Sequence, residues 1–294
     1  MMYRVVCFFV LMIFSVVAQA ELRVAATTPN MGMLARTVGG EAVEVTVMAP
    51  PDRDVHYLDA RPGMMAALRR ADLVVSVGAD LEVGWLPAAL EGANNRDVRM
   101  GTRGYFEATR KIELIETGAA ADRAGGDVHP AGNPHFYYDP VRTADVAMAM
   151  AERLGELDSE RADYYVDNAA RFRASVDERM ADWQRRLQDA PGMVQFHKDA
   201  NYLAARFDVP MLGDMEPLPG IPPTARHLRE LVNELRERDG VITYLVYHPS
   251  GAAEFLSGEL GWPKHQLPNN VSVDADAAAY FELIDRWVAA LAGE

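Results

Sequence analysis

The sequence predicts an α/β protein built from two mostly parallel α/β lobes that are joined by one long helix. Three observations predict this class. Short β-rich segments alternate with helical segments in both halves of the 294-residue chain, and this order produces parallel sheets. A nearly uninterrupted helical stretch at 140–188 separates the halves. The chain is also long enough to bury two cores.

In the first half, apolar runs end in turn residues and alternate with helical runs. Residues 43–48 read Val-Glu-Val-Thr-Val-Met, the alternation of a half-buried strand, and two prolines follow it closely. The stretch 117–132 is rich in Ala, Gly and Asp, so we expect a flexible loop there. The predicted elements of this half are strands at 22–28, 43–48 and 72–78 and helices at 31–38 and 64–70.

The middle of the chain is predicted to be two helices, at 143–157 and 159–188. The second would be about 45 Å long at 1.5 Å per residue, which is longer than one lobe needs. Its apolar residues recur at steps of three to five and form a plausible buried stripe: Tyr164, Ala169, Phe172, Val176, Met180, Trp183 and Leu187. We therefore expect an N-terminal lobe at 21–157, a linking helix at 158–188 and a C-terminal lobe at 189–294.

The second half repeats the alternation of strands and helices. Residues 242–247 are the most β-rich run of the chain. The predicted elements are strands at 192–197, 209–212 and 242–247 and helices at 200–207, 224–238, 252–260 and 277–292.

The first 20 residues have the pattern of a cleaved signal peptide. Arg4 precedes an apolar run, and Ala18-Gln19-Ala20 is a small-x-small cleavage site. The apolar run is too short for a comfortable membrane span. We expect cleavage after Ala20 and a soluble protein that is released into the periplasm if the source is Gram-negative. An uncleaved anchor is the alternative.

Composition narrows the possible partners and metal ligands. The only cysteine, Cys7, lies in the predicted signal peptide, so the mature chain can form neither a disulfide nor a thiolate metal site. Removing Arg4 with that segment leaves 28 basic and 43 acidic side chains, a net charge of −15. This sign argues against nucleic acid and anionic lipid as partners. It suits a soluble exported protein.

Three histidines, far apart in sequence, are candidates for a metal site. His56 follows a predicted strand, His135 follows Asn-Pro, and His197 ends a predicted strand. Imidazole is the commonest protein ligand for divalent transition metals. Ligand-bearing loops of open α/β sheets lie outside the carboxyl ends of the strands, so one metal site would explain all three. Taken alone, each histidine is a surface or hydrogen-bonded residue by default.

The remaining candidates have separate expectations. His129 could reach the same site, although a loop role is the default, and we expect His197→Ala to weaken zinc binding more than His129→Ala. Asp199 could accept a hydrogen bond from His197, and Asp139 could cap the helix that begins at Pro140. His248 is expected to be structural or to lie at the cleft rim. His227 and His265 are expected at the surface.

Four stretches together resemble the substrate-binding proteins of bacterial zinc/manganese ABC importers. They are His56 with Arg61-Pro62 and the segment 71–86, Asn133-Pro134-His135 with Asp139-Pro140, His197-Lys-Asp-Ala-Asn-Tyr, and the segment 216–224. The match runs in order along essentially the whole mature chain. The resemblance implies two α/β lobes, one rigid linking helix and a metal ion in the cleft between the lobes.

The resemblance also implies metal ligands at His56, His135 and His197, but it leaves the fourth ligand open. The family usually supplies an Asp or His from the segment near 267–276, and here 267–273 holds no carboxylate. Glu216 is our leading candidate as a ligand; it could instead orient the turn at 220–223 or a ligand imidazole. Asp274, Asp276 and water are the alternatives. The loop before His135 holds only His129, so it is no His-rich scavenging loop.

These inferences lead to one function and two alternatives. Three imidazoles and one oxygen suit Zn(II), whereas Mn(II) prefers more oxygen ligands. We expect a monomeric periplasmic receptor, not an enzyme, that delivers zinc, or less favourably manganese, to the membrane permease of an ABC importer. A metal-independent adhesin and a secreted zinc hydrolase are the alternatives, although no His-Glu-x-x-His, Gly-x-Ser-x-Gly or phosphate-loop motif is present.

Overall fold

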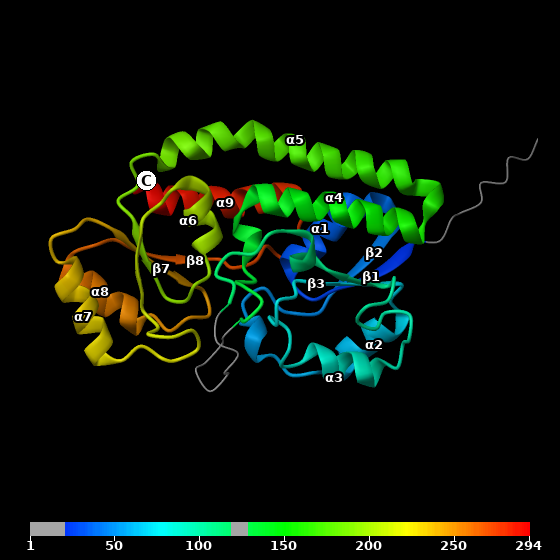
Figure 1. Cartoon of the computed structure of the whole chain (residues 1–294), viewed down its shortest axis with the longest axis horizontal. Coiled ribbons are helices and arrows are strands. Elements are labelled where there is room, and N and C mark those ends of the chain that lie inside the picture. The colour runs from blue at the N-terminus through cyan, green and yellow to red at the C-terminus, as the bar shows by residue number, and fades with distance from the viewer. Residues whose placement is uncertain (1–20, 119–128) are drawn as a thin grey trace, which may run out of the picture.

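The computed structural model describes residues 21–118 and 129–294. The predicted signal peptide at 1–20 lies outside these residues, and so does most of the loop predicted at 117–132. In the part that is described, two four-stranded sheets with helices around them confirm the predicted fold class (Figure 1).

The first sheet has the strand order β2-β1-β3-β4, and every adjacent pair is parallel. The central strand β3 is fully buried and so are the last three residues of its neighbour β1, as expected for strands covered on both faces. The predicted elements of this half are confirmed with small shifts at their ends; α3 and β4 were not predicted. The elements are β1 (Leu22–Ala26), α1 (Pro29–Gly39), β2 (Val43–Val47), α2 (Pro62–Arg70), β3 (Leu73–Ser76), α3 (Leu86–Ala93) and β4 (Tyr105–Glu107).

The second sheet repeats this topology with the order β6-β5-β7-β8, again entirely parallel. Only β8 among its strands was not predicted. The elements are β5 (Met193–Gln195), α6 (Asn201–Phe207), β6 (Met211–Asp214), α7 (Ala225–Leu235), β7 (Val241–Leu245), α8 (Gly251–Leu260), β8 (Lys264–Leu267) and α9 (Ala277–Ala292). In each sheet the chain passes from the first strand, β1 or β5, to a neighbour on one side and then crosses to the other side. The loops at the carboxyl ends of the strands therefore diverge beside β1 and β5 and leave a crevice.

Long helices connect the two sheets. The helix α5 (Ala162–Leu187) has 26 residues and is therefore about 39 Å long; it runs along one side of the molecule over both halves (Figure 1). It packs against α4 (Pro140–Leu157) and against α9. Asp139 caps α4 as predicted, because its Oδ1 accepts hydrogen bonds from the backbone N–H groups of residues 141 and 142.

The buried face of α5 agrees with the predicted stripe except at its first member and at Met180, which is only partly buried. Tyr164 is 40% exposed, whereas Tyr165 is fully buried and donates a hydrogen bond to Asp158. The stripe continues through Phe172 to Trp183, whose indole N–H donates to Asp285 of α9. One continuous core therefore includes the first sheet, α4, α5 and α9, while a smaller core lies under α7 and α8. This packing holds the loops of both sheets in fixed positions.

Candidate metal centre

Four histidines meet where the loops of the two sheets face each other. His56 comes from the loop after β2, His129 and His135 from the segment between β4 and α4, and His197 from the loop after β5. The ring centroids of His56 lie 5.2 Å from His129, 5.4 Å from His135 and 5.6 Å from His197. The centroids of His135 and His197 are 5.5 Å apart. The three predicted histidines are therefore brought together, and His129 joins them.

His56 and His129 face each other through their Nε2 atoms, which are 3.1 Å apart. The other nitrogen of each ring has an acceptor. His56 Nδ1 lies 2.7 Å from Asp54 Oδ1, and His129 Nδ1 lies 2.9 Å from the carbonyl oxygen of Ala79. Burial opposes ionisation of Asp54, but its hydrogen bonds with His56 outweigh burial and lower the pKa of the carboxyl group. The loop after β3 thus positions His129, and a carboxylate positions His56.

His135 is 2% exposed and presents an unpaired nitrogen to the centre of the cluster. Its Nδ1 lies 2.9 Å from the hydroxyl of Tyr137, which in turn donates to Asn269 Oδ1. Nε2 has no hydrogen-bond partner among the described residues, and neither has Asp199 Oδ1, 4.0 Å away. Burial and the charges of the neighbouring histidines hold the pKa of His135 well below its ordinary value, so the ring is neutral and able to bind a metal.

His197 is held by the carboxylate of Glu216. His197 Nδ1 lies 2.8 Å from Glu216 Oε2, which also accepts a hydrogen bond from the backbone N–H of Gly220. Burial alone would lower the pKa of His197, but the hydrogen bond to Glu216 and the charges of Asp199 and Glu216 outweigh it and raise the pKa to about 9. Burial also raises the pKa of Asp199 to about 7.

The candidates for a fourth ligand occupy different surroundings. Glu216 contacts His197 Nδ1, a position from which the carboxylate can orient the imidazole ring. The side chain of Asp274 is 98% exposed near Arg36, and Asp276 caps α9 through the backbone N–H groups of residues 278 and 279. Asn269 stands in the segment from which the resemblance implies an Asp or His ligand, and it bonds to tyrosine hydroxyls.

The other histidines lie outside this cluster. His248 stacks on Phe196 at 4.2 Å and its Nδ1 accepts the backbone N–H of Leu245, in keeping with the predicted structural position at the rim. His227 Nε2 contacts the carbonyl oxygen of Asp214. His265 is half-buried on β8, so the prediction of a surface position is only partly right.

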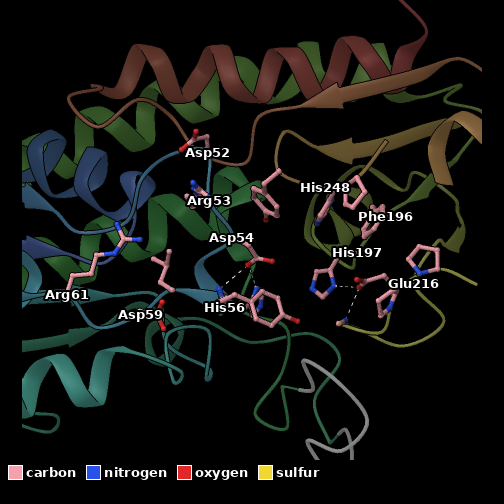
Figure 2. A pocket seen from close by; sticks show the side chains of 17 residues that line it. Asp52, Arg53, Asp54, His56, Asp59, Arg61, Phe196, His197, Glu216 and His248 are labelled. Atoms are coloured by element: carbon pink, nitrogen blue, oxygen red, sulfur yellow. Dashed lines mark hydrogen bonds and ion pairs between the residues drawn. The ribbon is translucent and has the colours of Figure 1, made fainter. Parts of the chain in front are cut away.

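Two members of the cluster, His56 and His197, line an open cleft of about 730 Å³. Figure 2 shows His56 and His197 facing each other across it, each tied to its carboxylate. One wall comes from the loop after β2, and the other comes from the loops after β5, β6 and β7: the lining residues include Asp52, Arg53, Asp59, Arg61, Pro222, Pro223, Tyr247 and Pro249. An ion could enter here from solvent.

The arrangement suits a transition-metal ion. Two overlapping triads could each hold one: His56, His129 and His135, and His135, His197 and Asp199. Zinc–nitrogen bonds of about 2.0–2.1 Å in a tetrahedron place neighbouring nitrogens about 3.3 Å apart and ring centroids about 5.2 Å apart. The spacings from His56 to the other three rings and from His135 to His197 are close to this value, whereas the rings of His129 and His135 are 6.2 Å apart. A loop role is the default expectation for His129 from the sequence, and the structure places its ring against His56.

Comparison with known proteins identifies a family for this chain. A family model described as "Zinc-uptake complex component A periplasmic" matches residues 24–293. The high-affinity zinc uptake protein ZnuA of Yersinia pestis is 23% identical over 76% of this chain and 75% of its own. The manganese-transporter substrate-binding lipoprotein PsaA of Streptococcus pneumoniae is 20% identical over 74% of this chain and 69% of its own.

A solved structure agrees with the fold. The substrate-binding protein FpvC of Pseudomonas aeruginosa, in complex with Ni²⁺, superposes with a TM-score of 0.77 at 22% identity and covers 93% of this chain and 96% of its own. Within residues 21–118 and 129–294, no helix combines the length and the apolar character that a membrane crossing requires.

Proposed function

Because the chain belongs to the family of periplasmic zinc-uptake components, which are substrate-binding receptors of metal ABC importers, we propose that it captures zinc in the periplasm and delivers it to the permease of such an importer. The observation that carries this proposal is the convergence of four imidazole rings, two of which line the cleft. The receptor is released by cleavage after Ala20 and works as a monomer.

The proposed ligands include His56, His135 and His197, one from each of three loops. Each has its Nδ1 against an acceptor on the protein, so that Nε2 is directed toward the ion. Such partners fix the ring orientation and raise the basicity of the ligand nitrogen. Glu216 takes this role for His197 and is not itself a ligand in this proposal.

Zinc is favoured over manganese because of the donor atoms. Neutral imidazole suits Zn(II), Ni(II) and Cu(II), while Mn(II) prefers carboxylate, carbonyl and water oxygens. The relatives are named for both zinc and manganese. The choice of zinc in this proposal therefore rests on the donor atoms of this chain. A metal-independent adhesin would be indifferent to a chelator, and a zinc hydrolase would show turnover.

We expect the purified mature protein to bind one zinc ion per chain and to unfold at a higher temperature with zinc. A ligand that binds only the folded state adds about 4 kcal/mol at a thousandfold excess over Kd, which for a protein of this size corresponds to roughly 10 °C. Isothermal titration calorimetry and thermal unfolding after EDTA treatment measure both, with magnesium as the control ion. A stoichiometry far from one, or no thermal shift with zinc, would refute the proposed function.

Glu216→Gln tests the orienting role of this carboxylate. Loss of such a partner typically weakens metal binding by about 10- to 100-fold, and we expect a zinc affinity in that range with the stoichiometry unchanged. Competition titration against a chromophoric chelator provides the measurement. Glu230→Gln, on the exposed face of α7, is the control and should leave the affinity unchanged. An affinity equal to that of the parent would remove Glu216 from the site.

A further inference from the structure

We infer that His129 is a fourth imidazole ligand, which replaces the usual carboxylate of the family and makes the centre selective for nitrogen-preferring ions over Mn(II). This inference rests on the proposed function and deepens it. It assigns a ligand to the chain's own residues and predicts which ions are rejected.

The first argument is the direction of two lone pairs. The acceptors beside His56 Nδ1 and His129 Nδ1 are a carboxylate and a carbonyl oxygen, neither of which can donate a hydrogen bond. In the neutral form that binds metals, both rings therefore carry their hydrogen on Nδ1, and each Nε2 atom presents a lone pair. These two acceptors face each other at 3.1 Å. A shared cation between them removes the repulsion.

The second argument is the spacing around that position. The distance of 3.1 Å between His56 Nε2 and His129 Nε2 is close to the edge of about 3.3 Å in a zinc tetrahedron. His135 Nε2 is buried, has no hydrogen-bond partner among the described residues, and forms a possible ligand triad with these two atoms. All three histidines precede α5, so the N-terminal half alone supplies three imidazoles. His197 adds a fourth ring from the C-terminal half.

The third argument is that the carboxylates near the centre fit less well. Asp199 Oδ1 lies 4.0 Å from His135 Nε2, which is longer than a tetrahedral edge of about 3.3 Å, although Asp199 forms a possible ligand triad with His135 and His197. Glu216 is bound to the outer nitrogen of His197. Asn269, in the segment of the usual carboxylate, accepts from Tyr137 and Tyr138 and donates to Tyr247. Asp199 is thus placed to balance the charge of the ion from outside its ligand set.

Four imidazoles without an oxygen ligand would set the selectivity. Zn(II), Ni(II) and Cu(II) accept an all-nitrogen shell, whereas Mn(II) loses the oxygen donors that it prefers. Replacing His129 by a carboxylate should therefore weaken zinc binding and improve manganese binding. A residue that served only to hold the loop would change both affinities in the same direction.

The variants His129→Asn and His129→Asp test the inference with zinc and manganese ions alone. Asparagine keeps a donor for the Ala79 carbonyl but has no counterpart of Nε2. The matched control is His227→Asn, because His227 also donates one ring hydrogen bond to a backbone carbonyl, outside the cluster. Competition titrations give the affinities, the visible spectrum of the cobalt(II) form reports coordination number, and circular dichroism checks folding.

We expect His129→Asn to bind zinc at least about tenfold more weakly, since even an orienting partner is worth that much, and to lose the intense cobalt spectrum of a four-coordinate site. His129→Asp should narrow the ratio of zinc to manganese affinity. If His129→Asn binds zinc as tightly as His227→Asn, or if Asp199→Asn alone removes the cobalt spectrum, the inference is overturned while the proposed function stands. A parent protein that binds no zinc overturns both.

Discussion

Replacement of His135 by alanine is expected to reduce zinc affinity by about a thousandfold or more, equivalent to roughly 4 kcal/mol of binding free energy. His135 is the residue that both possible ligand triads share, so its loss breaks either arrangement. Its buried nitrogen has no other hydrogen-bond partner in the described part of the chain, and no neighbouring imidazole can take its place without moving a loop. Competition titration at neutral pH measures the loss.

A second variant and a control separate binding from folding. His135→Asn keeps a donor toward the hydroxyl of Tyr137 and removes Nε2, so it should lose zinc affinity with little effect on metal-free stability. The control is His248→Asn, which changes a half-buried histidine at the same cleft, one that contacts the backbone and Phe196 rather than the cluster. Equal losses at both positions would show that general packing of the cleft, not ligation by His135, sets the affinity.

The fold could be predicted because most of its elements carry their own signal. The alternation at 43–48 and the long helical run at 140–188 survive as β2, α4 and α5 with boundaries moved by a few residues. The strands that escaped prediction, β4 and β8, are short edge strands. The β8 sequence Lys-His-Gln-Leu has no apolar alternation, and pairing with β7 determines its conformation. Local pattern carries no information about such pairing.

The candidate site was predictable to the extent that its histidines stand beside strand ends. His56 and His197 follow predicted strands, and parallel sheets direct such loops to one edge. His129 has no such anchor in the sequence, because the carbonyl that holds it belongs to Ala79, 50 residues away. The role of Glu216 is likewise a matter of tertiary contact: its loop places it against the outer side of His197. Contacts of this kind can be read only from coordinates.

The pH dependence of zinc binding follows from the charge of His197. In the metal-free protein its pKa is raised to about 9, above the ordinary value of about 6.5, so the ring holds an extra proton at pH 7. Zinc binds only the neutral ring, and each bound ion must displace that proton. Zinc affinity should therefore rise by roughly tenfold per pH unit from pH 7 toward pH 9, and it should fall further in acid as other ligand histidines are protonated.

The proton on His197 has the opposite effect on the metal-free protein, whose stability should fall over the pH range in which zinc affinity rises. Because the folded pKa of His197 exceeds the unfolded value, its protonation stabilises the fold below about pH 6.5, and this stabilisation is lost as pH rises through about 9. The gap between the unfolding temperatures of the zinc-loaded and metal-free forms should thus widen between pH 7 and pH 9. Calorimetry in buffers of different ionisation enthalpy counts the proton released per ion. Glu216→Gln removes one of the carboxylates that raise this pKa, so the proton release and the slope of zinc affinity against pH should both diminish. A parent affinity that stays flat over this range would mean that His197 is already neutral at pH 7.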